Sequence, residues 1–419
     1  PDERPPLRRV KHGNFMWDMT RALKSECRLE VLPHLQISLL QMPVVGLFRR
    51  TKTIVSVPAI FFCNPEHGGL RVAALTVLDR LLITAHRAGC STLTVVCDGE
   101  IPDIPRARAL GIDPSVVRQA PKFMGPTLIA TANLLVQHED VVALIIDGGR
   151  LVTPDKKLLP VGIAKKLDGT VVQTLHKAHK VISVGVARRV EDNFMAAMAE
   201  DELWETMGSS TDGLVDTYFN RPAGRPVSKL LIHTSATPNE ISMFATIVGV
   251  GAAVCLGQGD QRWDIIGALV LQLSAAIDCV DGDIARMGFK ESKFGKWLDL
   301  VGDQVVHMAL FVAIAMGVAA AKPEVPALAL GVSAALGVLI AFGVVLRGIL
   351  HPDARGNTRL QRLIDATTNR DFSVVIIVLV FANRLDLFLW AAAIGVHVFW
   401  LLTLGLQLYG RHQTTENLA

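Results

Sequence analysis

The sequence predicts two structural parts, an α/β domain with a mostly parallel sheet followed by an all-α transmembrane domain of six helices. Composition is the first reason, because 50% of the 419 residues are hydrophobic and 19% are charged, which is more apolar than is usual for a soluble protein. Distribution is the second reason: short apolar runs alternate with charged residues up to about residue 225, and long apolar segments dominate after about residue 240. The boundary, residues 220–235, is rich in proline, glycine and arginine.

Charge and cysteine content narrow the possible functions. The formal net charge of +3 is too small to predict a nucleic-acid partner. The six cysteines form no C-x-x-C pair, so we expect neither a zinc site nor a redox motif, and their scatter is typical of a reducing compartment. The basic, proline-rich first residues are not followed by the apolar core of a signal peptide. These features favour an integral membrane protein over a nucleic-acid binder.

In the first part, strand-like runs alternate with a helix-like run. Residues 73–88 repeat apolar side chains at helical spacing and stop before Gly89, a residue suited to end a helix. The strand-like runs are residues 55–63, 92–97 and 141–146, with further candidates at 170–173 and 181–186. This alternation predicts a sandwich of helices against a mostly parallel sheet.

The second part contains six apolar segments, most of them close to the ~20 residues that a helix needs to cross a bilayer. The first is preceded by Thr237, a good N-cap, and Pro238, which suits the first helical position. The fifth is short, so we allow its start to extend back into Arg370 and Asp371. The segments are residues 241–256, 265–286, 294–321, 326–350, 372–382 and 385–409.

Loop charges predict the orientation of these helices. Arginine and lysine gather between the second and third segments and between the fourth and fifth, whereas the other loops hold mainly Arg262, Lys322 and Arg384. By the positive-inside rule, the basic loops, the α/β domain and the C-terminus are cytoplasmic. The predicted divisions are an N-terminal extension (1–50), a cytosolic α/β domain (51–210), a juxtamembrane segment (211–236) and the transmembrane domain (237–419).

Four aspartates flank the turn between the second and third segments. Asp278 and Asp281 share one helix face, and Asp299 and Asp303 share another. The short turn makes the two helices antiparallel neighbours, so we expect the four carboxylates to converge near the cytoplasmic surface. Like charges in such a place are costly, and one or two bound divalent cations relieve the cost. Oxygen ligands favour Mg²⁺, Mn²⁺ or Ca²⁺ over Zn²⁺.

Two glycines in the same motif, Gly282 and Gly295, leave room for a ligand or for close backbone approach. Any single aspartate has an alternative interpretation as an interfacial acid balanced by Arg286 and the nearby lysines. The complete spacing D-x2-D-G-x2-A-R-x8-G-x3-D-x3-D is much harder to explain in that way.

This spacing resembles the signature of the CDP-alcohol phosphatidyltransferase family, and the resemblance extends over residues 212–409, including the upstream run Asn220-Arg221-Pro222. It implies six transmembrane helices, a homodimer, and a cytoplasmic active site in which an acceptor hydroxyl attacks the phosphorus of a CDP-alcohol and CMP leaves. Asp303 would be the general base. One or two Mg²⁺ or Mn²⁺ ions would be bound by Asp278, Asp281, Asp299 and Asp303. Ca²⁺ would be a non-productive occupant of the same site. The residues lining the CDP site would be Asp278, Gly282, Ala285, Arg286 and Gly295.

Two arginines are candidates for the acceptor site. Arg347 and Arg370 end the fourth segment and begin the fifth, where they suit the phosphate of an anionic acceptor. The alternative is that they only anchor the helices at the cytoplasmic surface. His307, one turn after Asp303, is either a structural histidine or a further contact of the site.

The first part resembles sugar-nucleotide and cytidylyl transferases of the nucleotidyltransferase class in the order of its elements, mainly over residues 74–97. The glycine-rich loop with a basic residue that this class carries after the first strand is missing, and residues 63–69 read CNPEHGG. Only Asp147 stands where a metal-binding aspartate is expected. We therefore predict a degenerate domain used for docking, regulation or substrate capture.

Two other functions stay open. A bifunctional enzyme would make the CDP-alcohol in its first part and convert it to a polyol phosphodiester in its second. A cation transporter would use the same aspartates as an ion site, although it predicts acids spread over several helices near the membrane midplane. The donor alcohol and the acceptor are not readable, but a site at the membrane surface favours phospholipid or polar-headgroup biosynthesis, with membrane lipid as a partner and no nucleic acid.

Overall fold

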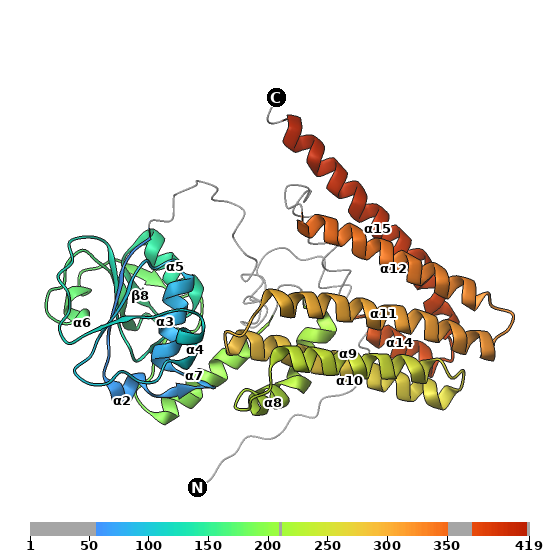
Figure 1. Cartoon of the computed structure of the whole chain (residues 1–419), viewed down its shortest axis with the longest axis horizontal. Helices are drawn as coiled ribbons and strands as arrows, with labels where there is room; N and C mark the ends of the chain where they lie inside the picture. The colour runs from blue at the N-terminus through green and yellow to red at the C-terminus, as the bar shows by residue number, and fades with distance from the viewer. Residues whose placement is uncertain (1–55, 209–211, 351–370, 417–419) are drawn as a thin grey trace, which may run out of the picture. The chain divides into compact units, whose positions relative to one another are not determined.

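The structure is a computed structural model that describes residues 56–208, 212–350 and 371–416 (Figure 1). Residues Ile54–Ala419 belong to one compact unit. The predicted N-terminal extension and Arg370 lie outside the described residues.

A seven-stranded sheet forms the centre of the α/β domain, in the order β10-β8-β9-β6-β1-β4-β5. The central strand β1 pairs in parallel with β4 and β6, β4 pairs in parallel with β5, and β8 pairs in parallel with β10. Only β9 runs antiparallel to its neighbours β6 and β8, so the prediction of a mostly parallel sheet is confirmed. The strands are β1 (Ala59–Phe62), β4 (Leu93–Val96), β5 (Ser115–Val117), β6 (Thr127–Thr131), β8 (Arg150–Val152), β9 (Leu158–Ala164) and β10 (Lys180–Ile182).

The helix predicted over residues 73–88 is α3 (Val77–Arg87), which begins later because residues 71–76 form a small hairpin. The Thr76 side chain accepts a hydrogen bond from the Asp79 N–H at the N-terminus, and Gly89 follows the helix with φ = 93°. Such a backbone favours glycine, so the predicted end is confirmed. The other elements of this domain are α2 (Pro65–Gly68), β2 (Arg71–Val72), β3 (Leu75–Thr76), α4 (Pro105–Ala109), β7 (Leu134–Leu135), α5 (His138–Asp147), α6 (Val171–Thr174), β11 (Arg188–Arg189) and α7 (Asn193–Thr206).

Two strand predictions in this domain are wrong. Residues 141–146 belong to helix α5, in which Val141 and Leu144, three residues apart, are the buried apolar side chains. A short apolar run has no periodicity that separates a strand from a helix, and here the acidic first turn favours the helix. Residues 170–173 begin helix α6, because Thr170 and Gln173 form a reciprocal capping box. Residues 181–186 are only partly extended, since β10 ends at Ile182.

The second part of the chain is helical (Figure 1). Thr237 and Glu240 form a capping box at the start of α9, which confirms the predicted N-cap. Helices α9, α10, α11, α12 and α15 are long and apolar enough to cross a membrane, whereas α14 is apolar but has only 10 residues. The elements are η1 (Asp216–Asn220), α8 (Arg221–Leu231), α9 (Pro238–Leu256), α10 (Gln261–Met287), α11 (Lys293–Ala321), α12 (Ala327–Leu350), α14 (Phe372–Phe381) and α15 (Leu385–Glu416).

Small residues bring the helices that carry the aspartates close together. A Cβ added to Gly249 on α9 would lie 2.8 Å from a methyl of Val306 on α11 and 3.0 Å from the hydroxyl oxygen of Ser274 on α10. The Ser274 hydroxyl also donates a hydrogen bond of 2.7 Å to the Ala245 carbonyl of α9. Close backbone approach and hydrogen bonds between helices are the usual means of association in a lipid environment. They place α9 against both helices of the acidic motif.

Candidate active site

Three of the four motif aspartates meet between α10 and α11. One carboxylate oxygen each from Asp278, Asp299 and Asp303 can be chosen so that all lie within 4.8 Å of one another. Asp299 is exposed, and the other two are partly buried. Three carboxylates at this separation repel one another, and a hard divalent cation held by their oxygens removes that repulsion. The donor set therefore fits Mg²⁺ or Mn²⁺ and does not resemble a zinc site.

The fourth motif aspartate, Asp281, lies outside that group of three. It is 8% exposed, and its carboxylate accepts a hydrogen bond from the hydroxyl of Ser242 on α9. Ser242 is itself buried and lies 3.1 Å from the Pro238 carbonyl oxygen, in the first turn of its helix. Ser242 was not predictable from the sequence, because a serine in an apolar helix carries no signal of its partner. The contact orients the Asp281 side chain from a third helix.

A small cavity adjoins the aspartate group. Asp278 and Asp303 line it together with polar side chains from four helices, and the aromatic ring of Phe372 packs against His307 with 5.1 Å between ring centroids. His307 therefore borders the same cavity as Asp303. The polar residues of the lining, besides the aspartates, are Thr246, Ser274, His307 and Ser373.

The two motif glycines lie at close contacts. A Cβ on Gly282 would lie 3.1 Å from both terminal nitrogens of Arg286, so the guanidinium of Arg286 lies against the bare backbone of α10. A Cβ on Gly295 would lie 2.9 Å from the amide oxygen of Asn239, at the start of α9. Ala285 is partly buried on the same helix as Arg286. These residues add small surfaces and one cation to the two helices that carry the aspartates.

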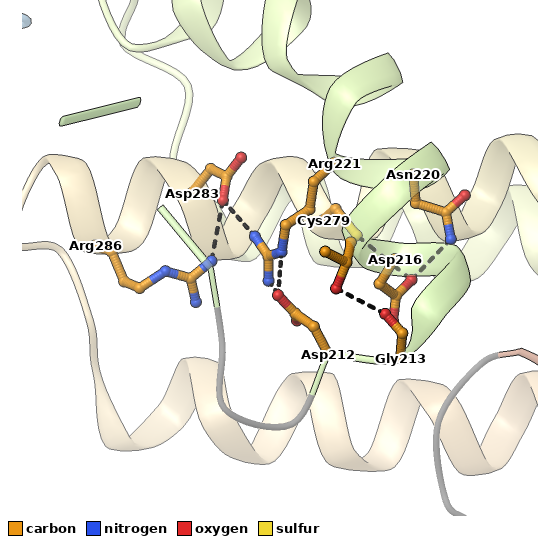
Figure 2. Close-up of polar contacts among 9 residues, drawn as sticks. Asp212, Gly213, Asp216, Asn220, Arg221, Cys279, Asp283 and Arg286 are labelled. Carbon is orange, nitrogen blue, oxygen red and sulfur yellow. Dashed lines mark hydrogen bonds and ion pairs between the residues drawn. The ribbon is translucent and has the colours of Figure 1, made fainter. Parts of the chain in front are cut away.

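A buried ion-pair network joins the juxtamembrane segment to the motif (Figure 2). Arg221 on α8 donates to Asp283 on α10 at 2.5 Å, and to the two carboxylate oxygens of Asp212 at 2.5 and 2.7 Å. Arg286 donates to the same oxygen of Asp283 at 3.0 Å. Asp283 is 2% exposed, and Arg221 is 7% exposed. Breaking a buried pair of this kind typically costs about 3–5 kcal/mol, so the network holds α8 and Arg286 in place.

A second set of polar contacts ties the same segment to other helices, and Figure 2 shows the part of it between Asn220 and Asp216. Asn220 donates to Asp216 at 2.7 Å and accepts from Gln272 on α10 at 2.5 Å. The backbone N–H groups of Leu214 and Val215 donate to the carboxylate of Asp371, the residue that precedes α14. The sequence did not signal the contacts with Gln272 and Asp371, because these partners are distant along the chain.

The structure describes only one of the two arginines predicted to bind the acceptor. Arg347 is partly buried in the last turn of α12, and Arg370 lies outside the described residues.

In the α/β domain, the candidate Asp147 does not follow a strand. It is the exposed last residue of helix α5, because the strand predicted before it is that helix. The segment after β1 forms the short helix α2, and the side chain of its N-cap residue, Asn64, accepts a hydrogen bond from the N–H of Glu66. Burial, with a smaller contribution from neighbouring Cys97, raises the pKa of the Cys63 thiol to about 12. A protonated, partly buried thiol is a poor nucleophile, which argues against a catalytic cysteine here.

Comparison with known proteins relates the helical part to one family. The sequence profile of CDP-alcohol phosphatidyltransferases matches residues 235–405. A phosphatidylinositol phosphate synthase of Corynebacterium glutamicum is 32% identical over 174 residues, which are 41% of this chain and 77% of that protein. A bifunctional IPC transferase and DIPP synthase of Aquifex aeolicus is 30% identical over 105 residues, 25% of this chain and 23% of that protein. The chain thus matches less than a quarter of the bifunctional relative.

Part of the chain also aligns with solved structures at low similarity. The phosphatidylinositol phosphate synthase PgsA1 of Mycobacterium tuberculosis with CDP-DAG bound aligns with a TM-score of 0.37 and 18% identity, over 44% of this chain and 94% of that chain. The same protein in complex with manganese and citrate aligns with a TM-score of 0.35 and 18% identity, over 45% of this chain and 88% of that chain.

Proposed function

Because the chain belongs to the CDP-alcohol phosphatidyltransferase family, we propose that it transfers a substituted phosphate group from a CDP-alcohol to an acceptor alcohol and releases CMP. The observation that carries the proposal is the meeting of Asp278, Asp299 and Asp303 within 4.8 Å on two neighbouring helices. Phospholipid or polar-headgroup biosynthesis is the process that such an enzyme serves in a membrane. A transporter would need acids spread along a path, whereas these lie in one group.

The aspartates hold one or two Mg²⁺ or Mn²⁺ ions in this proposal, with Asp281 as the fourth ligand and Ca²⁺ as a non-productive occupant. Bound ions neutralise the pyrophosphate and stabilise the charge that develops on the leaving CMP. The contact with Ser242 supports the role of Asp281, because a hydrogen bond to a ligand carboxylate orients it.

Asp303 acts as the general base. It belongs to the aspartate group and also lines the cavity, so a hydroxyl that enters the cavity reaches a carboxylate able to accept its proton. The acceptor oxygen then forms a bond to the phosphorus attached to the donor alcohol, the bond from that phosphorus to CMP breaks, and the proton stays on Asp303. His307 borders the cavity and contributes to the shape of the acceptor's path.

The CDP moiety is bound beside Gly282, Ala285, Arg286 and Gly295. The Nε of Arg286 is buried and has no hydrogen-bond partner among the described residues, while one terminal nitrogen binds Asp283. A buried donor without a partner is costly, and a phosphate oxygen satisfies it. Arg347 and Arg370 bind the phosphate of an anionic acceptor in this scheme.

The proposed setting is a homodimer in the membrane, with six spans counting the short α14 and with the α/β domain and C-terminus in the cytoplasm. We propose the same domain divisions as from the sequence: an N-terminal extension (1–50), an α/β domain (51–210), a juxtamembrane segment (211–236) and a transmembrane domain (237–419).

The test is CMP release from a panel of CDP-alcohols, each paired with polar acceptors, with Mg²⁺, Mn²⁺ or a chelator. We expect release only with metal, and we expect Asp303→Asn to abolish it while the donor still binds. The exposed Asp113→Asn in the α/β domain is the matched control and keeps full activity. Activity of Asp303→Asn within about tenfold of the wild type would refute the general-base role, since such a base contributes roughly 10²–10⁴-fold.

The bifunctional alternative is favoured by one observation, the similarity to the bifunctional IPC transferase and DIPP synthase of Aquifex aeolicus. We propose instead a degenerate nucleotidyltransferase-like α/β domain, because helix α2 stands where a phosphate loop would be. Incubating the full chain with CTP and a polyol phosphate distinguishes the two. Formation of a CDP-alcohol would establish the bifunctional reading.

A further inference from the structure

The turn between α10 and α11, residues 288–292, connects the helix that carries Asp278 and Asp281 to the helix that carries Asp299 and Asp303. Phe289 in this turn has φ = 53°, a left-handed backbone that a bulky side chain rarely adopts. Such a conformation persists where the surroundings over-determine it. Besides a local hydrogen bond from its N–H to the Arg286 carbonyl, Phe289 has contacts with the α/β domain.

Arg106 binds the backbone of the turn directly. Its Nε and one terminal nitrogen donate to the Phe289 carbonyl oxygen at 3.2 and 2.6 Å. Arg106 is the second residue of the short helix α4, whose first N–H groups, those of Arg106 and Ala107, donate to the fully buried carboxylate of Asp79 at 3.0 and 2.7 Å. Asp79 lies in α3, so the donor is attached to the core of the α/β domain.

The side chains of the turn are held from the same side. The Phe289 ring packs against the hydrophobic core of the α/β domain, with the guanidinium carbons of Arg87 and Arg80 at 4.8 and 5.7 Å from its centroid. Arg87 also pairs with Glu291 through two contacts of 2.9 and 3.3 Å. The ring, carbonyl and carboxylate of the turn therefore all contact the α/β domain.

A shared apolar cluster extends this attachment along α10. Val280, Ile284 and Met287, on the last two turns of α10, belong to one buried cluster with residues of the α/β domain. The α/β members that are fully buried in it include Val72, Val77, Val190 and Trp204. Val280 directly precedes Asp281, so the backbone that carries the motif is packed against the same domain.

We propose that the α/β domain sets the relative position of α10 and α11 by holding their turn, and that Arg106 is a positioning residue for the metal-binding aspartates. This rests on the proposed function for the reaction that the aspartates serve. Asp281 lies eight residues before Phe289 and Asp299 ten residues after it, within rigid helices, so a displaced turn displaces the carboxylates. Metal sites depend on ligand placement to within a few tenths of an ångström.

The experiment compares three variants of the full chain in detergent: Arg106→Ala, Arg106→Lys and the control Arg108→Ala. Arg108 lies on the same short helix, but its side chain is 59% exposed, and its ion pair with Asp103 is long, at 3.9 Å. Mn²⁺ binding without substrate is measured from the free-ion EPR signal, and kcat and KM are measured from CMP release. Thermal unfolding checks the fold.

We expect Arg106→Ala to weaken Mn²⁺ binding and to lower kcat by about tenfold each, the lower end of the range for residues that orient metal ligands. The donor KM changes less, Arg106→Lys recovers part of both losses, and Arg108→Ala matches the wild type. A purely structural role would leave Mn²⁺ affinity unchanged in the folded fraction. Mn²⁺ affinity and kcat of Arg106→Ala within twofold of the wild type would overturn the proposal.

A second variant covers the case in which Arg106→Ala does not fold. Phe289→Leu keeps an apolar side chain but removes the aromatic ring between the arginines, and it is expected to weaken Mn²⁺ binding to a smaller extent, about threefold. Wild-type affinity in a folded Phe289→Leu would then overturn the proposal. A wild-type chain that binds Mn²⁺ but releases no CMP from any donor would refute the proposed function and leave this comparison valid.

Discussion

Replacing Arg221 by methionine tests whether the buried network of Figure 2 holds the juxtamembrane helix against the acidic motif. The change removes three hydrogen bonds of 2.5–2.7 Å and leaves Asp283, whose side chain is 3% exposed, without its shorter ion pair. Loss of one partner of a buried pair costs about 3–5 kcal/mol. Arg286 still contacts Asp283 at 3.0 Å, which places the expected loss near the lower end, at about 3 kcal/mol.

The assay is the free energy of unfolding of the full chain in mixed micelles, followed together with CMP release. Arg225→Met is the matched control, because Arg225 lies on the same helix and its charge also acts on Asp283, but its Nε has no hydrogen-bond partner among the described residues. We expect the control to lose less than about 1 kcal/mol. The double variant Arg221→Met with Asp283→Asn is expected to recover part of the loss, since no buried charge is then left alone. An Arg221→Met loss equal to that of Arg225→Met would refute the reasoning.

Two further outcomes follow from single contacts. Gly282→Ala places a methyl 3.1 Å from the terminal nitrogens of Arg286. We expect the KM for the donor to rise about tenfold, which corresponds to the loss of one charge-assisted hydrogen bond of ~1.4 kcal/mol. The control Gly251→Ala, which has no atom within 4 Å of the added methyl, leaves this KM unchanged. Equal KM values would contradict this. The raised pKa of about 12, against 9.0 for an ordinary thiol, lowers the thiolate fraction of Cys63 at pH 8 by roughly a thousandfold. Iodoacetamide labelling of Cys63, followed by mass spectrometry, should therefore be at least a hundredfold slower in the folded chain than in urea, and equal rates would show that the thiol is not perturbed.

Local signals predicted the helical part well. The capping box that begins at Thr237 and the length of each apolar segment located the helix ends to within four residues, except that α15 continues seven residues past its predicted end, because capping and burial in lipid act on neighbours in the chain. The proximity of Asp278, Asp299 and Asp303 was also predictable, since helical periodicity and one short turn determine which side chains meet. In the α/β domain the same reasoning was wrong for residues 141–146, where an apolar run suited both a strand and a helix.

The sequence by itself determined where the long apolar helices lie, that Asp278, Asp299 and Asp303 approach one another and to which family the motif is similar, because each depends on spacing within a short stretch of chain. Only the tertiary structure decided that Arg221 neutralises Asp283, that Ser242 orients Asp281 and that Arg106 holds the carbonyl of Phe289. These partners are 39 to 183 residues apart. Pairing over such separations is chosen by the packing of whole helices and domains, which no local pattern of residues encodes.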